Sequence, residues 1–265
     1  MNFARKIINK LISIFNNNVN NLNLHLLNFL TKGVDSIEYN GEKMYFFKPN
    51  WVNKYRIKTF STKEPETLDW IDSIPEGSIL WDVGANVGLY SIYAAKKRKC
   101  QILAFEPSVF NLEWLARNIN ENNLQESISI VPLALSNRSC FNQFKMKNTD
   151  WGGALSTFGE SYDENGLNFD PVFKYTIAGV LADEVPDLFS TKKPEYLKID
   201  VDGIEHLILE GSNQILLTVK SLLIEIDDSF EEQAALSEKY LLQAGLHLKE
   251  KYCIIGSQYN QLWVR

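Results

Sequence analysis

Short apolar runs and amphipathic stretches alternate along most of the chain. Five apolar runs have the length of buried strands, namely 79–83, 101–107, 127–133, 196–200 and 221–227. The stretches between them place apolar residues at helical spacing, as Leu112, Leu115 and Ile119 do within 109–122. Regular alternation of strand and helix predicts an α/β fold with a largely parallel sheet between layers of helices.

The C-terminal part departs from this alternation. After helices predicted over 204–217 and 230–244, the segments His247–Tyr252 and Gln258–Val264 predict two strands joined by a Gly-containing turn. We therefore expect a seven-stranded, mostly parallel sheet that closes with an antiparallel hairpin.

The N-terminal part carries a different pattern. Two short strand-like runs flank Asn40-Gly41, which is a strong hairpin signal, and Thr67–Ser73 predicts a helix. Residues 1–32 predict an Asn-rich helical segment. We expect an N-terminal α/β extension over 1–75 and a catalytic core over 76–265.

A long polar stretch follows the third predicted strand. A connection of that length predicts a functional or mobile loop, with a strand and a short helix only over Thr176–Phe189. Its aromatic and acidic part, Trp151–Phe173, is expected to fold over an acceptor pocket.

Composition narrows the class of protein. The chain has 265 residues and a net charge of −6, which argues against a nucleic-acid partner because such a partner needs a basic face. Its three cysteines show no metal-binding or disulfide spacing, so we expect a reducing, cytoplasmic location. No apolar run is long enough for a transmembrane helix.

The most informative motif is the strand–turn–helix unit from Asp82 to Gly88. Glycines in such a turn let the backbone approach a ligand closely, and the unit is typical of nucleotide-cofactor sites. Glu106 ends the next strand, 18 residues after Gly88, where an acid can accept hydrogen bonds from both ribose hydroxyls.

Several sequence blocks together resemble the FkbM-type methyltransferases. The blocks are Asp82–Gly88, Phe105-Glu106-Pro107, Leu112 with Asn118 and Asn122, Ala134-Leu135-Ser136, Leu197–Glu205 and Gly211. The resemblance covers roughly residues 64–228 and departs from the family at Asp202, where glutamate is usual. It implies a Rossmann-like class I methyltransferase fold, S-adenosyl-L-methionine (SAM) as cofactor, and methyl transfer to a hydroxyl of a sugar, glycan or natural-product acceptor.

The resemblance also implies a set of cofactor-binding residues. Gly84, Ala85, Asn86 and Gly88 would hold the methionine end, and a carboxylate suits the free amides of the helix that follows. Asp82 is expected to accept hydrogen bonds from the methionine ammonium, or else to be a buried acid that caps the turn. Glu106, with Pro107, is expected at the ribose, and Ala134 and Leu135 at the adenine.

The catalytic candidates follow the fourth and fifth strands. A sugar hydroxyl is a poor nucleophile, so its proton needs a base, and Asp200 at a strand end is the leading candidate. Lys198 lies on the same strand face and either acts there or pairs with an acid such as Glu225. Glu225 lies in an apolar strand and needs a partner, and Glu205 opens the next helix, as a site residue or a cap.

Three alternatives remain open at this stage. Asp200, Asp227 and Asp228 could form a magnesium site, whereas Asp228-Ser229 could instead cap the next helix. The chain could be a nicotinamide-dependent oxidoreductase, although its turn lacks the full G-x-G-x-x-G pattern. It could also bind SAM without catalysis. The sequence does not identify the acceptor, the metal dependence or the oligomeric state.

Overall fold

The computed structural model describes residues 10–11, 13–14, 16, 19, 33–252 and 259–265. The helix expected within 1–32 and the turn of the C-terminal hairpin fall largely outside this part. Among the described residues, no helix is long and apolar enough to cross a membrane.

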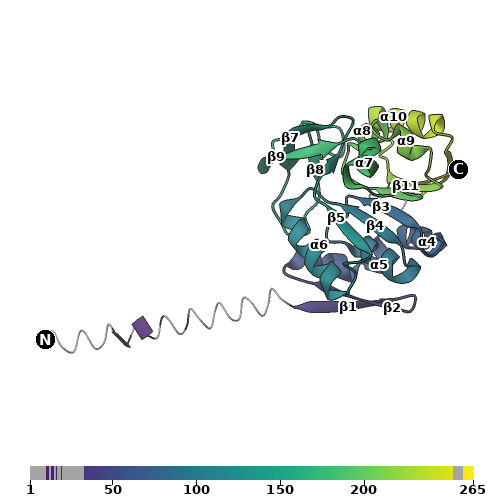
Figure 1. Cartoon of the computed structure of the whole chain (residues 1–265). Coiled ribbons are helices and arrows are strands. Elements are labelled where there is room, and N and C mark those ends of the chain that lie inside the picture. Colours follow the sequence, from purple (N-terminus) through teal and green to yellow (C-terminus); the bar gives the residue numbers. More distant parts are fainter. Residues whose placement is uncertain (1–9, 12, 15, 17–18, 20–32, 253–258) are drawn as a thin grey trace.

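A seven-stranded sheet forms the centre of the molecule (Figure 1). Its strand order is β12 (His247–Lys251), β13 (Asn260–Val264), β11 (Ser221–Glu225), β10 (Tyr196–Ile199), β3 (Ile79–Val83), β4 (Gln101–Phe105) and β5 (Ile128–Val131). All neighbours from β11 to β5 pair in parallel, and β13 runs antiparallel to both β11 and β12. The predicted sheet with its closing hairpin is confirmed.

Helices cover both faces of this sheet because its strands are apolar on both sides. On one face lie α4 (Pro65–Ser73), α5 (Leu89–Arg98) and α6 (Val109–Glu121), packed in one apolar cluster with Leu80 and Leu223. On the other lie α8 (Glu205–Glu210), α9 (Asn213–Leu216) and α10 (Glu231–Gln243), packed with Trp81 and Leu222. Figure 1 shows these two layers on opposite sides of β3, β4 and β11.

The helix predicted over 204–217 is two helices, α8 and α9, with Gly211 and Ser212 between them. At Gly211, an added Cβ would lie 2.2 Å from the Ser136 carbonyl oxygen. Only glycine fits at the end of α8, because the backbone of another segment comes that close.

The polar stretch predicted mainly as a loop contains a second sheet. Its order is β6 (Ala134–Leu135), β9 (Phe173–Val180), β7 (Cys140–Met146) and β8 (Ser156–Phe158), followed by a short 3₁₀ turn, η1 (Ala182–Glu184), and α7 (Val185–Phe189). β7 and β9 pair from Cys140 with Gly179 to Met146 with Phe173. The strand and short helix predicted over Thr176–Phe189 correspond to β9 and α7. β7 and β8 were missed because the pairing of β7 with β9 joins segments about thirty residues apart, whose half-exposed faces give weak local patterns.

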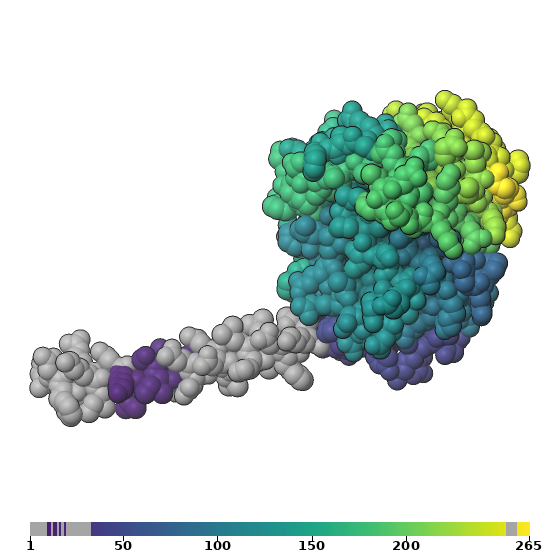
Figure 2. Space-filling view, viewed as in Figure 1, coloured from purple at the N-terminus to yellow at the C-terminus, as the bar shows by residue number. Residues whose placement is uncertain are grey.

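The extension packs directly on the core. β1 (Val34–Tyr39) and β2 (Glu42–Phe47) form the hairpin predicted around Asn40-Gly41, and α2 (Trp51–Lys58) and α3 (Phe60–Lys63) follow. The Asn122 side chain at the end of α6 accepts from Tyr45 N (3.0 Å) and donates to Tyr45 O (2.6 Å). Figure 2 shows the purple hairpin against the blue and teal part of the body. Residues 33–75 therefore share the apolar core of the sheet.

Candidate active site

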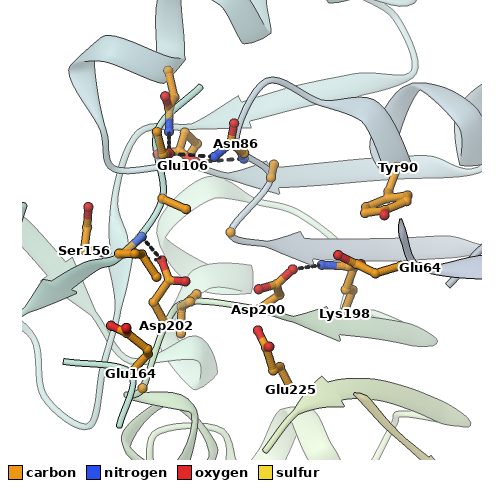
Figure 3. Close-up of a pocket in the computed structure, with 18 of the residues that line it drawn as sticks. Glu64, Asn86, Tyr90, Glu106, Ser156, Glu164, Lys198, Asp200, Asp202 and Glu225 are labelled. Carbon is orange, nitrogen blue, oxygen red and sulfur yellow. Dashed lines mark hydrogen bonds and ion pairs between the residues drawn. The ribbon is translucent and has the colours of Figure 1, made fainter. Parts of the chain in front are cut away.

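One cavity of about 440 Å³ lies at the carboxyl ends of β3, β4, β10 and β11 (Figure 3). This is the edge at which open α/β sheets bind ligands, and the volume is within the range of small-molecule sites. Its lining comes from the turn after β3, the end of β4, the acids after β10 and β11, the start of β8, and helices α2 and α3.

The turn after β3 is held in one conformation by the neighbouring strands. Gly84 N and Ala85 N both donate to the Phe105 carbonyl at 3.0 Å. Gly84 and Gly88 adopt φ of 88° and 87°, and a Cβ on Gly84 would lie 1.8 Å from the Asp200 carbonyl oxygen. Only glycine allows this approach, which brings the turn against the loop after β10.

Glu106 lies directly beside this turn. It is 4% exposed; its Oε2 accepts from Asn86 N and its Oε1 from Ser108 N, both at 2.7 Å. Burial raises the pKa of Glu106, and the amide hydrogen bonds offset part of that shift because they favour the ionised form. The net result is a pKa of about 7. Each carboxylate oxygen has a second lone pair, so Glu106 can still accept from a ligand.

Lys198, Asp200 and Glu225 form a charged cluster at the ends of β10 and β11. Lys198 Nζ lies 2.7 Å from Asp200 Oδ2, and the Lys198 side chain is 3% exposed. Burial alone would raise the pKa of Asp200, but Lys198 and a hydrogen bond with Glu225 hold it well below its usual range. Burial and the facing Asp200 raise the pKa of Glu225 well above its usual value. These opposite shifts favour the ionised form of Asp200 and the protonated form of Glu225.

Asp202 and Glu205 organise the loop after Asp200. Asp202 has φ of 64°, and its Oδ2 accepts from Leu155 N at 2.6 Å. Burial raises its pKa to about 6, and Asp200 adds to that shift. Glu205 accepts from Val201 N and Gly203 N at 3.0 Å and from Gln233 Nε2 at 2.5 Å. Glu205 thus holds the loop as a cap does, with its carboxylate already occupied.

The Trp151–Gly153 segment lies beside the turn, and its Gly153 lines the cavity. Its Gly153 carbonyl accepts from Asn86 Nδ2 at 2.8 Å and from Asn111 Nδ2 at 3.1 Å. Its Gly152 carbonyl accepts from Arg56 Nε on α2 at 2.8 Å. The segment therefore joins the turn to the N-terminal extension.

A family model for the methyltransferase FkbM domain matches residues 82–247, well over half of the chain. The chain belongs to the FkbM methyltransferase family.

Individual relatives agree with this assignment. The hexuronic acid methyltransferase AglP of Haloferax volcanii is 26% identical over 175 residues, which cover 65% of each protein. Methyltransferase sdnD of Sordaria araneosa is 28% identical over 54% of this chain and 64% of that protein. The match thus spans just under two thirds of each relative. The crystal structure of an FkbM methyltransferase from Methylobacillus flagellatus has a TM-score of 0.51 at 16% identity, covering 72% of this chain and 44% of that one, and shares the fold.

Family membership removes the support for a nicotinamide-dependent oxidoreductase. It agrees with the class I methyltransferase fold expected from the sequence, and it places the turn, Glu106 and the acids after β10 and β11 within the FkbM domain.

Most of the residues expected at the site lie around the one cavity. They are Gly84, Ala85, Asn86, Glu106, Pro107, Lys198, Asp200, Glu205 and Glu225. Gly88 begins α5 immediately behind this lining. Ala134 and Leu135 line a narrow adjoining hollow of about 30 Å³, which shares Gly84 and Pro107 with the main cavity. What each residue binds stays a prediction.

Two expected contacts are different in the structure. Asp82 lies behind the turn and outside the cavity lining, where its Oδ2 accepts from Ser91 Oγ at 2.5 Å. This position matches the alternative of a buried strand-end acid. Lys198 pairs with Asp200 instead of Glu225, because residues two apart on a strand share a face.

The magnesium site suggested for Asp200, Asp227 and Asp228 finds no support in the described part of the structure. Over the described ranges, no three acidic, His or Cys side chains are grouped as metal ligands. Asp228 turns away to Lys251 Nζ at 2.8 Å, while Asp200 is occupied by Lys198. Asp228 was the residue expected to cap the next helix. In the structure it is the Oδ1 of Asp227 that accepts from Ser229 N, in the turn before α10.

The residues that the extension contributes were missed in the sequence analysis. Arg56, Thr59, Phe60, Lys63 and Glu64 all line the cavity. The sequence signal was a run of cations without acids over 51–63 in an otherwise acidic chain.

Proposed function

We propose that this chain is a SAM-dependent O-methyltransferase that acts on a hydroxyl of a sugar or glycan. The observation that carries the proposal is the 2.7 Å hydrogen bond between Asn86 N and Glu106 Oε2. It joins a glycine turn suited to the methionine end of SAM with a buried carboxylate suited to the ribose.

The residues present fit such a donor. Gly84, Ala85 and Asn86 of the turn line the cavity, and the buried Asn86 Oδ1 has no partner within the described part of the chain. An unpartnered buried polar atom is costly, so a ligand that donates to it would be stabilised. When bound, SAM supplies an electrophilic methyl group. The chain's part is to align the acceptor and exclude water.

Asp200 is our proposed base. Because Lys198 keeps it ionised throughout the neutral range, it can accept a hydrogen bond from the acceptor hydroxyl. Glu225 orients the second oxygen of Asp200, and Asp200 takes up the proton of the acceptor hydroxyl as the bond from that oxygen to the methyl carbon forms and the sulfur–methyl bond breaks. Glu205 serves as a positioning residue that fixes the loop between them.

The acceptor class rests on the lining and on one relative. Carboxylates at the cavity wall suit the hydroxyl groups of a sugar, and AglP is named for a hexuronic acid. Trp151 and the segment up to Phe173 are proposed to cover the acceptor, since Gly153 to Ser156 and Glu164 line the cavity.

Binding and turnover test the proposal separately. Calorimetric titration with SAM and with S-adenosylhomocysteine should show one saturable site, and absence of binding by both would overturn the donor assignment. Incubation with SAM and a panel of uronic-acid and neutral oligosaccharides should give a mass gain of one methyl group on one of them.

Asp200→Asn should abolish turnover while leaving S-adenosylhomocysteine affinity within about threefold, since it removes the base and not a donor contact. Asp228→Asn, at an exposed acid outside the lining as a matched control, should keep full activity. A fully active Asp200→Asn protein would remove Asp200 from the mechanism.

A further inference from the structure

We infer that Arg56 on α2 binds the carboxylate at the methionine end of the donor, so that part of the donor site lies outside the FkbM domain. The inference rests on the proposed function, because it assigns one residue of the extension to one group of SAM.

Two short contacts place Arg56 next to the cofactor turn. Arg56 Nε donates to the Gly152 carbonyl, and the adjacent Gly153 carbonyl accepts from Asn86 Nδ2, both at 2.8 Å. Only Gly152 and Gly153 therefore lie between the guanidinium and Asn86 of the turn along these contacts. Arg56 also lines the same cavity as Ala85, Asn86 and Leu89.

The guanidinium is oriented but still has free donors. Its Nε is fixed by Gly152, whereas no acceptor is found for Nη1 or Nη2 within residues 33–252 and 259–265. A fixed guanidinium with two free N–H edges is suited to a carboxylate, which accepts two parallel hydrogen bonds.

Charge around Arg56 favours an anion at this place. Lys63 lines the same wall and pairs with Glu64 at 2.7 Å, whereas Arg56 has no acidic partner among the described residues. Residues 51–63 contain no Asp or Glu, although the chain as a whole has a net charge of −6. The unpaired charge on this wall is therefore that of Arg56, and it favours an anionic group such as the donor carboxylate.

The first turn of α5 adds to the same anion site. Leu89 and Tyr90 begin α5 and line the cavity, and Gly88 offers no side chain to cap their amides. The ring of Phe60 on α3 lies 6.1 Å from the ring of Tyr90, so the extension packs over this helix end. Free amides at a helix start favour a carboxylate.

Two ligands that differ in the methionine end test the inference. S-adenosylhomocysteine carries the carboxylate, whereas 5′-methylthioadenosine keeps the adenosine and sulfur but lacks the amino-acid part. Calorimetry on the full chain should show that Arg56→Gln weakens S-adenosylhomocysteine binding by roughly 10- to 100-fold. The same variant should leave 5′-methylthioadenosine binding within about threefold.

Lys58→Gln is the matched control, since Lys58 lies on the same helix, is exposed and is outside the lining. It removes the same charge and should change neither affinity by more than about twofold. Should Arg56→Gln not fold, Arg56→Lys is measured with the same two ligands. It keeps the charge but loses the planar fork, so it should weaken S-adenosylhomocysteine binding more than 5′-methylthioadenosine binding.

Each other outcome is decisive. An Arg56→Gln protein with unchanged S-adenosylhomocysteine affinity overturns the inference alone. Equal weakening of both ligands also overturns it, and shows instead that Arg56 acts through the Trp151–Gly153 segment. Wild-type protein that binds neither ligand overturns the proposed function, and the inference with it.

Discussion

Glu106 and Asp200 are both buried acids in one cavity, yet their partners give them opposite ionisation behaviour. Glu106 receives only neutral amide donors, so burial dominates and its pKa rises to about 7. Asp200 has the Lys198 ammonium at 2.7 Å, which outweighs burial. A single cation therefore decides which acid titrates near neutral pH.

Donor affinity should follow the titration of Glu106. In the proposed donor site, the ionised carboxylate of Glu106 accepts from both ribose hydroxyls, whereas the protonated form offers one oxygen less. On that proposal, S-adenosylhomocysteine affinity should rise as pH increases through about 7. Below that pKa the affinity should fall by up to tenfold per pH unit. Calorimetry one pH unit on either side measures this.

Glu106→Gln supplies the comparison, since the amide does not titrate. Its affinity should be lower than that of the wild type and flat across the same interval. A wild-type protein with equally flat affinity would separate Glu106 from the ribose.

At the scale of elements, the close approach of the turn after β3 to the loop after β10 holds the cavity together. Gly84→Ala should destabilise the fold by roughly 2–4 kcal/mol, because its Cβ would lie 1.8 Å from the Asp200 carbonyl oxygen at a φ of 88°. Urea denaturation measures this loss.

Gly77→Ala is the matched control. Gly77 has a similar φ of 76° but nothing within 4 Å of an added Cβ, so only the backbone term of about 1 kcal/mol applies. Equal losses at the two glycines would show that the contact with Asp200 does not constrain the turn.

These elements also show what sequence can and cannot predict. β3, the turn and Glu106 were predictable because the motif is local and the strands are buried on both faces. The contact of Arg56 with Gly152 joins residues 96 positions apart and gives no periodic pattern. The two readings of Asp82 could not be separated, because sequence shows that an acid ends a strand, but not which side of the turn its side chain faces.

At the scale of the molecule, the extension and the core share one apolar cluster. We therefore expect a single thermal unfolding transition, in which Asn122→Ala lowers the free energy of unfolding of the whole chain. The loss should be about 1–3 kcal/mol, because both Tyr45 backbone groups lose their partner.

Asn120→Ala, at an exposed position on the same helix, should change the free energy by less than about 0.5 kcal/mol. A separate early transition in the Asn122→Ala protein, seen by calorimetry, would show instead that residues 33–75 unfold on their own.

The proposed contact of Arg56 with the donor carboxylate has a consequence for turnover. Loss of the methyl group changes the sulfonium and leaves the carboxylate as it was, so on this proposal the spent donor keeps the whole of its contact with Arg56. The spent donor should then compete with the fresh one, and S-adenosylhomocysteine should inhibit turnover. Added salt should weaken the binding of both, because screening acts on the carboxylate contact that they share.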